Sequence, residues 1–330
     1  MSLIKPIKIG NITVEDPVIL APMTDVTDKP FRHIVKKHGA GLVISEMIAS
    51  QAMIRQTRQS MLMIQRSDIE SPMAVQLAGC EPEVMAEAAK LNEDMGAEII
   101  DINMGCPMKK VVNNYAGSAL MRDELLAGRI LEAVVKAVKV PVTLKMRMGW
   151  DDHSLNAPKL AQIAEGSGIQ MITVHGRTRC QLYNGKANWP FIRTVKDAVK
   201  IPVIGNGDVL TVDNAKQLLE ESGADGVMIG RGVYGKPWFV QQVIDFLKNG
   251  VRTPDPSMEH QYEVVKEHFA AMIDHYGERS GVLVGRKHMG WYSKGVKNST
   301  EFRLLLNQAT EAHSVKELIT RFFEEHLATS

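Results

Sequence analysis

The chain has 330 residues, of which 45% are hydrophobic and 23% are charged, and its formal net charge is +1. This ordinary globular balance excludes a disordered chain and a strongly basic nucleic-acid-binding protein, so any RNA contact has to come from a local patch. The three cysteines form neither a disulfide framework nor a zinc pattern, and no apolar run is long enough to span a membrane, so we expect a cytoplasmic protein without a membrane partner or a bound metal.

Eight short apolar runs rich in β-forming residues divide the first three quarters of the chain. They are Val18–Met23, Leu42–Met47, Met73–Gly79, Glu98–Met104, Pro141–Met148, Met171–His175, Ile201–Asn206 and Gly226–Gly230. Most intervals between them are typical of amphipathic helices, for example Pro82–Met95, Leu125–Val138, Ala157–Ser167 and Thr211–Ser222. Strands that are apolar on both faces and alternate with helices indicate a parallel sheet covered by helices. Eight such units favour a closed (β/α)8 TIM barrel over an open doubly wound sheet.

Polar and reactive side chains follow these runs at their carboxyl ends. The ends read Pro22-Met23-Thr24-Asp25, Ser45-Glu46-Met47, Gln76, Asn103-Met104-Gly105-Cys106-Pro107, Lys145-Met146-Arg147, His175-Gly176-Arg177-Thr178, Asn206-Gly207-Asp208 and Gly230-Arg231-Gly232. The carboxyl ends of barrel strands meet at one rim, and barrel enzymes have their active sites there. The opposite rim lacks such groups, so the sequence predicts an enzyme rather than a scaffold.

The later strand ends carry groups that suit a phosphorylated cofactor. Barrels often bind a phosphate through the loops after strands seven and eight, where Gly207 and Gly230 allow a close approach and Arg231 adds a cationic fork. Lys145 and His175 are donors that could face an electron-rich ring. Each of these two alone could equally be a structural rim residue, and the agreement among five strand ends favours the cofactor.

The run from Gly230 to Gly235 also matches the G-x-G-x-x-G pattern of dinucleotide-binding proteins. That fingerprint requires a first strand before it and a helix, a second strand and an acid after it. Here the glycines follow the last predicted strand, and Pro237 and Trp238 come directly after them. We therefore interpret the run as a phosphate loop and not as a Rossmann motif.

Cys106 differs from the other two cysteines in its position. A lone cysteine is more often a small buried hydrophobe than a catalyst, and Cys80 and Cys180 are assigned to that class. Cys106 lies between a glycine and a proline on the reactive rim. A thiol there could act as a general acid, and Asn103 could hydrogen-bond a polar heterocycle.

The character of the sequence changes after Leu247. Asn249-Gly250 and the proline-containing segment Thr253–Pro256 predict a linker, and helix-like segments follow at Met258–Tyr276, Gly281–Lys294, Thr300–Ala309 and Ser314–Ala328. Because no strand lies between them, these segments predict a small C-terminal helical bundle. We therefore expect a catalytic barrel domain over residues 1–247 and a helical domain over residues 248–330.

The tail contains a basic stretch between Arg279 and Arg303. This stretch has six basic residues and one acidic residue, Glu301. His288, Trp291 and Tyr292 lie among the basic residues. Cations and stacking aromatics suit RNA, whose backbone is anionic and whose splayed bases stack. Such a run is more often only a solvated helix face, so the stretch by itself leaves both interpretations open.

These motifs together resemble the bacterial tRNA-dihydrouridine synthases. The strings that carry the resemblance are APMTDVTDKPFR, VQLAG, DINMGCP, AGSALM, VTLKMRMGW, HGRTR, IPVIGNGDV, MIGRG and RKHMGWY, which run in order over essentially the whole chain. The combination of DINMGCP with HGRT and NGD is far more specific than any one of them. The sequence is most similar to the B-type subfamily.

The resemblance implies an FMN-binding barrel and a helical domain that grips tRNA. By matching motif positions, the FMN contacts are expected at Pro22, Met23, Thr24, Gln76, Lys145, His175, Asn206, Gly207, Asp208, Gly230 and Arg231. Cys106 takes the position of the proton donor and Asn103 that of the residue holding the target uracil. Arg286, Lys287 and His288 match positions near the tRNA backbone. Some relatives have alanine in place of Thr24, so only its backbone role is carried over.

The expected reaction is the reduction of a tRNA uridine, with NADPH or NADH as the transient hydride donor and no obligate protein partner. Reduced FMN delivers hydride to C6 of a flipped-out uracil, and Cys106 protonates C5. Two other functions remain open at this point: an FMN barrel acting on a free pyrimidine, like dihydroorotate dehydrogenase, and a non-catalytic RNA-binding protein on a barrel scaffold. The sequence leaves the modified uridine and the oligomeric state undetermined.

Overall fold

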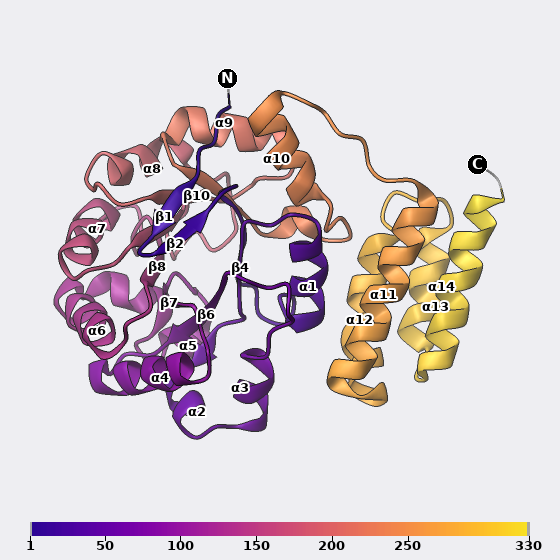
Figure 1. The fold of residues 1–330 in the computed structure, drawn as a ribbon, viewed down its shortest axis with the longest axis horizontal. Coiled ribbons are helices and arrows are strands. Elements are labelled where there is room, and N and C mark those ends of the chain that lie inside the picture. The colour runs from indigo at the N-terminus through magenta and orange to yellow at the C-terminus, as the bar shows by residue number, and fades with distance from the viewer. Residues whose placement is uncertain (1, 329–330) are drawn as a thin grey trace.

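The computed structural model describes residues 2–328, and eight parallel strands form a closed barrel in it (Figure 1). The strands are β3 (Val18–Leu20), β4 (Leu42–Ile44), β6 (Met73–Ala78), β7 (Ile99–Met104), β8 (Val142–Arg147), β9 (Met171–His175), β10 (Val203–Asn206) and β11 (Gly226–Ile229). Neighbouring strands pair in order, and the pairings of β11 with β3 and of β4 with β6 close the ring. The predicted strands and the predicted barrel are confirmed. A short strand, β5 (Ile48–Ala49), lies beside the carboxyl end of β6.

Helices cover the outside of the barrel in the intervals that the sequence predicts. They are α1 (Lys29–Lys37), α4 (Pro82–Asp94), α6 (Glu124–Ala137), α7 (Ala157–Gly166), α8 (Trp189–Lys196), α9 (Val212–Ser222) and α10 (Phe239–Asn249). Shorter helices occupy the connections: α2 (Ser50–Ile54), α3 (Arg58–Met63), α5 (Lys109–Val112), η1 (Gly117–Arg122) and η2 (Arg231–Val233). Local signals set several ends. The Asp28 side chain accepts a hydrogen bond from the Phe31 N–H at the start of α1, and Gly223 ends α9 in the left-handed conformation.

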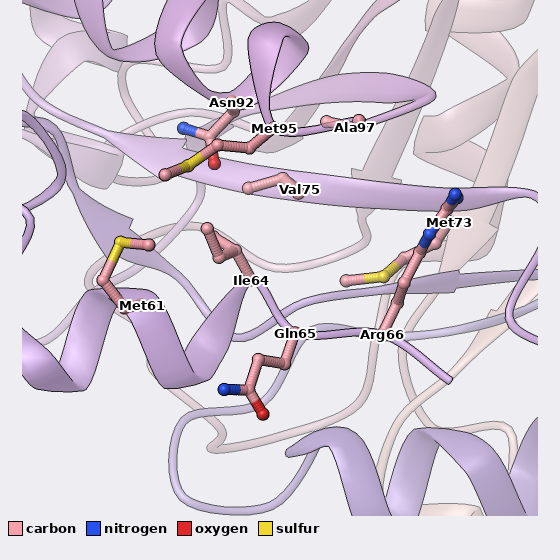
Figure 2. Close-up of a pocket in the computed structure, with 10 residues that line it drawn as sticks. Met61, Ile64, Gln65, Arg66, Met73, Val75, Asn92, Met95 and Ala97 are labelled. Carbon is pink, nitrogen blue, oxygen red and sulfur yellow. The ribbon is translucent and has the colours of Figure 1, made fainter. Parts of the chain in front are cut away.

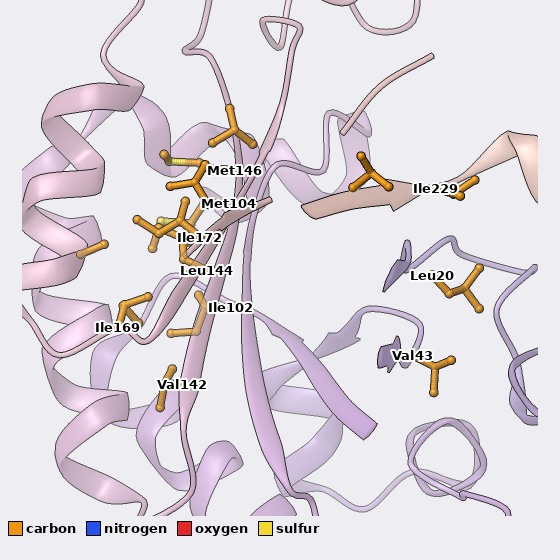
Figure 3. Close-up of a cluster of buried hydrophobic side chains, with 14 of the residues drawn as sticks. Leu20, Val43, Ile102, Met104, Val142, Leu144, Met146, Ile169, Ile172 and Ile229 are labelled. Atoms are coloured by element: carbon orange, nitrogen blue, oxygen red, sulfur yellow. The ribbon is translucent and has the colours of Figure 1, made fainter. Parts of the chain in front are cut away.

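Side chains along each strand alternate between the helix layer and the interior of the barrel. Outward residues such as Leu20 and Val43 pack against the helices in one large apolar core, part of which is shown in Figure 3. Inward residues such as Ile19, Leu42 and Ile204 form a second cluster inside the barrel. The same alternation continues to the carboxyl ends of the strands, so it decides which polar side chains face the mouth.

A hairpin that the sequence analysis missed precedes the barrel. Its strands, β1 (Ile7–Ile9) and β2 (Ile12–Val14), pair antiparallel around a turn in which Gly10 has a φ of 60°. Apolar side chains from both strands belong to the cluster inside the barrel. Since β2 lies just before the amino end of β3, the hairpin covers the amino-terminal opening, where Figure 1 shows it across the centre of the ring.

Four helices follow α10 and form a bundle beside the barrel (Figure 1). They are α11 (Met258–Tyr276), α12 (Glu278–Tyr292), α13 (Ser299–Gln308) and α14 (Ala312–Leu327). The bundle has its own apolar cluster, which Ile34 of α1 and Trp238 before α10 join from the barrel. The two parts therefore share buried apolar surface. No helix within residues 2–328 has the length and apolar character needed to cross a bilayer.

Candidate active site

Polar side chains from consecutive strands form one layer at the carboxyl rim of the barrel. The layer consists of Gln76, Asn103, Lys145, His175 and Asn206, from β6, β7, β8, β9 and β10. In the parallel register Asn103 lies opposite Lys145, and His175 lies opposite Asn206. Each of these residues occupies an inward position of its strand, so the fold brings together side chains that are far apart in the sequence.

Lys145 is a partly buried ammonium with one hydrogen-bond acceptor among the described residues. Its Nζ reaches only the Oδ1 of Asn206, at 3.4 Å. Burial, with repulsion from Arg147, lowers the pKa of Lys145 to about 8. An amine with spare N–H groups at the mouth of a barrel is suited to donate to an electron-rich group that enters the mouth.

His175 is held as a neutral ring. Burial, followed by the positive charges of Arg147, Lys145, Arg177 and Arg231, holds its pKa well below the ordinary value. Its Nε2 lies 3.4 Å from Nη1 of Arg177. The cations around His175 make this part of the rim electropositive, and a neutral imidazole adds a polar contact without further charge.

Asp208 organises the loop after β9 rather than presenting a free carboxylate. It accepts two hydrogen bonds from the buried Arg177, at 2.7 and 3.0 Å, and others from the Ala187 N–H at 2.8 Å and from Arg231 at 3.2 Å. Although burial opposes ionisation, the contacts with Arg177, Ala187 and Arg231 hold the pKa of Asp208 below its usual value. Its expected contact with the cofactor therefore remains a prediction, while its role in positioning the loop is visible.

Gly207 is required by its surroundings. Its φ is 119°, and an added Cβ would lie 2.8 Å from the Ala187 Cβ and 2.9 Å from Cδ2 of His175. A larger residue would therefore push against both the loop after β9 and the His175 ring. Gly230 differs, because the nearest atom to an added Cβ is the Met23 Sδ at 3.5 Å, which is ordinary contact.

Pro22, Met23 and Thr24 form the start of the loop after β3, which neighbours β11 in the barrel. The backbone of Met23 is fixed by Thr27, whose Oγ1 accepts from the Met23 N–H at 2.9 Å. Thr24 is exposed, and Pro22 and Met23 are partly buried. These residues and Gly230 thus lie side by side at the rim, as expected for two parts of one binding site.

A chain of hydrogen bonds runs beneath the rim to Cys106. Gln76 donates to Asp101 at 2.6 Å and accepts from Asn103 at 2.8 Å. The Oδ1 of Asn103 then accepts from the backbone N–H of Cys106 at 2.9 Å. Thr143 donates to the second oxygen of Asp101 at 2.6 Å. Both the oxygen and the nitrogen of the Asn103 amide are therefore held in place. One N–H of Asn103 and one N–H of Gln76 stay available for a bound molecule.

The Cys106 thiol is a suitable acid. Burial raises its pKa, although the Met108 N–H, Arg147 and Lys145 act in the opposite direction. It therefore stays protonated near neutral pH, and the two cations would stabilise the thiolate that proton donation leaves behind. Ser118 fixes the loop, because its N–H and Oγ both donate to the Cys106 carbonyl, at 3.0 and 2.8 Å.

Arg147, Arg177 and Asp101 were not among the predicted site residues. Arg147 donates to the carbonyls of Gly105 and Leu182, both at 2.8 Å, and so joins the loop of Cys106 to the loop after β9. The sequence did contain a signal for the two arginines. Arg147 stands two residues after Lys145, and Arg177 stands two residues after His175. At this spacing, side chains of an extended chain point to the same side, so each arginine could have been placed with its predicted neighbour. For Asp101, the inward position two residues before Asn103 is the corresponding signal.

The tail residues expected at the tRNA backbone do not all lie at the surface. His288 is only 1% exposed, with its ring 5.2 Å from Phe31 of the barrel, which places it in the interface between bundle and barrel. Arg286 is partly buried and donates to the Ala309 carbonyl. Lys287 reaches the barrel, where its Nζ donates to the Asp25 carbonyl. Tyr292 is also buried, so it has no face free for a base.

A separate cavity of about 380 Å³ lies on the flank of the barrel between α3 and α4 (Figure 2). Its lining is largely apolar and rich in methionine, with Met61, Met73 and Met95 among the residues. Asn92 also lines it and has an Oδ1 without a hydrogen-bond partner in the part of the chain that the structure describes. None of the lining residues belongs to the rim layer, so this cavity is not part of the candidate active site.

The rim fits a phosphorylated aromatic cofactor such as FMN. Lys145 offers N–H groups besides the one directed at Asn206, and the amides of Gln76 and Asn206 lie in the same layer. Arg231 is 49% exposed at the side chain and can turn to a phosphate, with Gly230 beside it. Fold and rim together define an enzyme of the (β/α)8-barrel class whose polar groups converge at the carboxyl ends of the strands.

Comparison with known proteins assigns the chain to a particular family within this class of enzymes. Residues 19–327 match the family model described as Dihydrouridine synthase (Dus). The chain is 61% identical over 319 residues to a probable tRNA-dihydrouridine synthase of Rickettsia bellii, covering 96% of this chain and 98% of the relative. It is 47% identical over 321 residues to tRNA-dihydrouridine synthase B of Xanthomonas axonopodis pv. citri, covering 97% of each. The chain belongs to the dihydrouridine synthase family, and the resemblance found in its motifs is confirmed.

Solved structures share the barrel. Morphinone reductase in complex with tetrahydroNAD superposes with a TM-score of 0.56 at 15% identity, over 79% of this chain and 94% of that one. Histamine dehydrogenase from Rhizobium sp. 4-9 gives 0.55 at 12% identity, over 74% of this chain and 48% of that one. At these identities the likeness shows the fold alone.

Proposed function

We propose that this protein reduces the C5–C6 double bond of uridine in tRNA, using FMN and NADPH or NADH. Membership of the dihydrouridine synthase family supports the reaction. The observation that carries the proposal is the rim itself, where a partly buried amine, a neutral imidazole and a protonated thiol meet at one barrel mouth. This combination offers donors for a cofactor ring and an acid for its substrate.

FMN is the cofactor that the rim residues would hold. Lys145, His175, Asn206 and Gln76 would hold the ring from the barrel interior, with Pro22, Met23 and Thr24 beside it. Gly207, Asp208, Gly230 and Arg231 would hold the phosphate, and the Arg231 guanidinium would stabilise its negative charge. When bound and reduced by the nicotinamide, FMN supplies the hydride chemistry.

The chain itself supplies orientation and the proton. Asn103 directs its remaining N–H toward the target uracil, which has to leave its stacked setting to reach the mouth. With the hydride that bound, reduced FMN would supply for C6, the Cys106 thiol would give its proton to C5, so that two C–H bonds replace the double bond. Arg147 and Lys145 lower the energy of the resulting thiolate, which then regains a proton from solvent.

The tRNA would lie across the barrel mouth and the bundle, with residues 1–247 as the catalytic domain and residues 248–330 as the tRNA-binding domain. Lys294 and Lys297 are exposed on the segment after α12, as a contact with an RNA backbone requires. Arg286 and Lys287 remain proposed contacts, while the buried His288 supports the bundle from inside. We place the reaction in the cytoplasm, without a membrane or an obligate protein partner.

The purified protein tests this proposal directly. It should show flavin absorbance, and with NADPH it should form dihydrouridine in unmodified tRNA. Free uridine and orotate should react at least about 10²-fold more slowly, because the binding energy of the remaining tRNA is lost with them. Preference for a free pyrimidine would favour the dihydroorotate dehydrogenase-like alternative, and a protein that takes up no FMN would contradict the proposal.

A further inference from the structure

One face of α12 in the bundle touches the loop after β3 in the barrel. Lys287 and Trp291 are four residues apart, so both lie on the same side of the helix. The loop that they approach begins with Pro22, Met23 and Thr24, three of the proposed FMN contacts. The segment from Met23 to Asp25 is called the cofactor turn below.

The first contact fixes Asp25 from two sides. The Lys287 Nζ donates to the Asp25 carbonyl, and the Asp25 N–H donates to Oε1 of Glu46 at 2.6 Å. Asp25 has a φ of 62°, in the left-handed region that is uncommon for residues other than glycine, although aspartate enters it more readily than most. Glu46 stands at the carboxyl end of β4 and is buried. The backbone N–H and carbonyl of Asp25 are thus held by a barrel carboxyl group and a bundle amine, respectively.

The second contact reaches Met23 through an aromatic pair. The Trp291 ring stacks on Tyr234 with 4.0 Å between ring centroids and 6° between planes. The Tyr234 hydroxyl donates to the Met23 Sδ at 3.4 Å. The end of α12 comes very close to the barrel here, since a Cβ at Gly235 would lie 2.9 Å from the Tyr292 nitrogen. No larger residue fits at Gly235 without moving α12 away.

From these two contacts we infer that α12 is a positioning element for FMN: through Lys287 and Trp291 it holds the cofactor turn in its binding conformation. The inference rests on the proposed function, and it assigns the bundle a role besides binding tRNA. Because tRNA would dock on the bundle, its arrival would bear on the geometry at the flavin through the same two residues. Lys287 and Trp291 are positioning residues, since they act through Asp25 and Tyr234.

FMN affinity without tRNA is the decisive measurement. Lys287→Met keeps the aliphatic side chain and removes the donor, and Trp291→Ala removes the stacking surface. Each should weaken FMN binding by about three- to tenfold, the effect of one exposed hydrogen bond or aromatic contact, and should alter the visible circular dichroism of the flavin. Lys287→Arg restores a donor and should recover most of the affinity.

Lys316→Ala is the matched control, because it removes one exposed charge from α14, on the side of the bundle away from the barrel (Figure 1). It should leave FMN affinity and the flavin spectrum unchanged. Thermal unfolding of each variant shows whether the fold is intact, and Trp291→Phe replaces Trp291→Ala if that protein does not fold. Unchanged FMN affinity in both Lys287→Met and the folded Trp291 variant would overturn the inference about α12 but not the proposed function. A wild-type protein that binds no FMN would overturn the proposed function as well.

Discussion

At the scale of single residues, the position of Cys106 depends on three side chains that hold the backbone of its loop. Asn103 holds its backbone N–H, Ser118 holds its carbonyl, and Arg147 holds the preceding carbonyl of Gly105. Three residues from different parts of the chain therefore fix one short loop. The thiol is held still, and a proton donor has to be placed accurately to be effective.

Removing the thiol should separate cofactor binding from turnover. Cys106→Ala should keep a yellow, FMN-loaded protein but slow dihydrouridine formation by about 10² to 10⁴, the usual cost of losing a general acid. Cys80→Ala applies the same change to a cysteine outside the site and should stay within about twofold of the wild type. Single-turnover formation of dihydrouridine in tRNA measures both, and normal turnover of Cys106→Ala would remove the thiol from the mechanism.

Much of the site could be predicted from residue types at strand ends, but not how each side chain is used. The inward positions of Lys145, His175 and Asn206 follow from strand periodicity, which a sequence reveals. The engagement of Asp208 by Arg177 does not, because it depends on the path of a loop that returns over the rim. The burial of His288 was likewise hidden, since the tail shows its basic character in sequence but not the face that meets the barrel.

At the scale of elements, alternating apolar runs predicted all eight strands of the barrel, and their bounds shifted by at most a few residues. The hairpin of β1 and β2 was missed because its strands have only three residues each. A signal did exist, since Ile7–Ile9 and Ile12–Val14 alternate around Gly10-Asn11, a pair that favours a two-residue hairpin turn.

The loop between β7 and α6 provides a test at this scale. Gly117 has a φ of 60°, and a Cβ there would lie 2.8 Å from the Cys106 carbonyl oxygen. Gly117→Ala should therefore displace the thiol and lower the rate at least about tenfold while FMN stays bound, because the nearest obstacle is backbone that carries the acid. Stopped-flow oxidation of reduced flavin by tRNA measures the step.

Gly250→Ala is the control for Gly117→Ala, because it strains the backbone without displacing a neighbouring group. Gly250 has a φ of 70° and nothing within 4 Å of an added Cβ, so the substitution costs about 1 kcal/mol of stability through the left-handed conformation alone. It should leave flavin oxidation unchanged. Equal rates for the two alanine variants would show that Gly117 does not position the acid.

At the scale of the whole molecule, the interface between barrel and bundle contains two adjacent buried histidines. The rings of His268 and His288 lie 4.9 Å apart, and neither Nε2 has a hydrogen-bond partner within residues 2–328. His268 contacts the Tyr292 hydroxyl at 3.0 Å through Nδ1. Burial lowers the pKa of His268 to about 3, and burial with the proximity of His268 holds the pKa of His288 well below its ordinary value. Both rings are therefore neutral in the folded protein.

Acid should consequently weaken this interface. Between about pH 6.5 and pH 3 the unfolded chain binds a proton at His268 and the folded protein does not, so stability falls as pH falls. From pH 7 to pH 5 this one group lowers the free energy of unfolding by about 2 kcal/mol. His268→Gln keeps a polar partner for Tyr292 and should remove the contribution of His268 to this pH dependence of stability. The contribution of His288 should remain.

Urea unfolding of wild type and His268→Gln at several pH values measures this difference. Between pH 7 and pH 8 the histidine is largely neutral in both states, so the two proteins should change in parallel there. Below pH 6.5 the wild type should lose stability faster. Parallel curves down to pH 5 would mean that His268 accepts its proton inside the folded molecule.

The hairpin that covers the amino-terminal opening of the barrel has a consequence for the order of events in the proposed reaction. Within residues 2–328, apolar side chains from β1 and β2 pack into the cluster inside the barrel at its amino-terminal opening, which leaves the mouth as the route to the rim groups. In the proposed reaction a nicotinamide ring and a uracil would use that same opening. If they occupy it in turn, the oxidised dinucleotide would depart before the RNA base enters, and bound flavin would store two electrons in the interval.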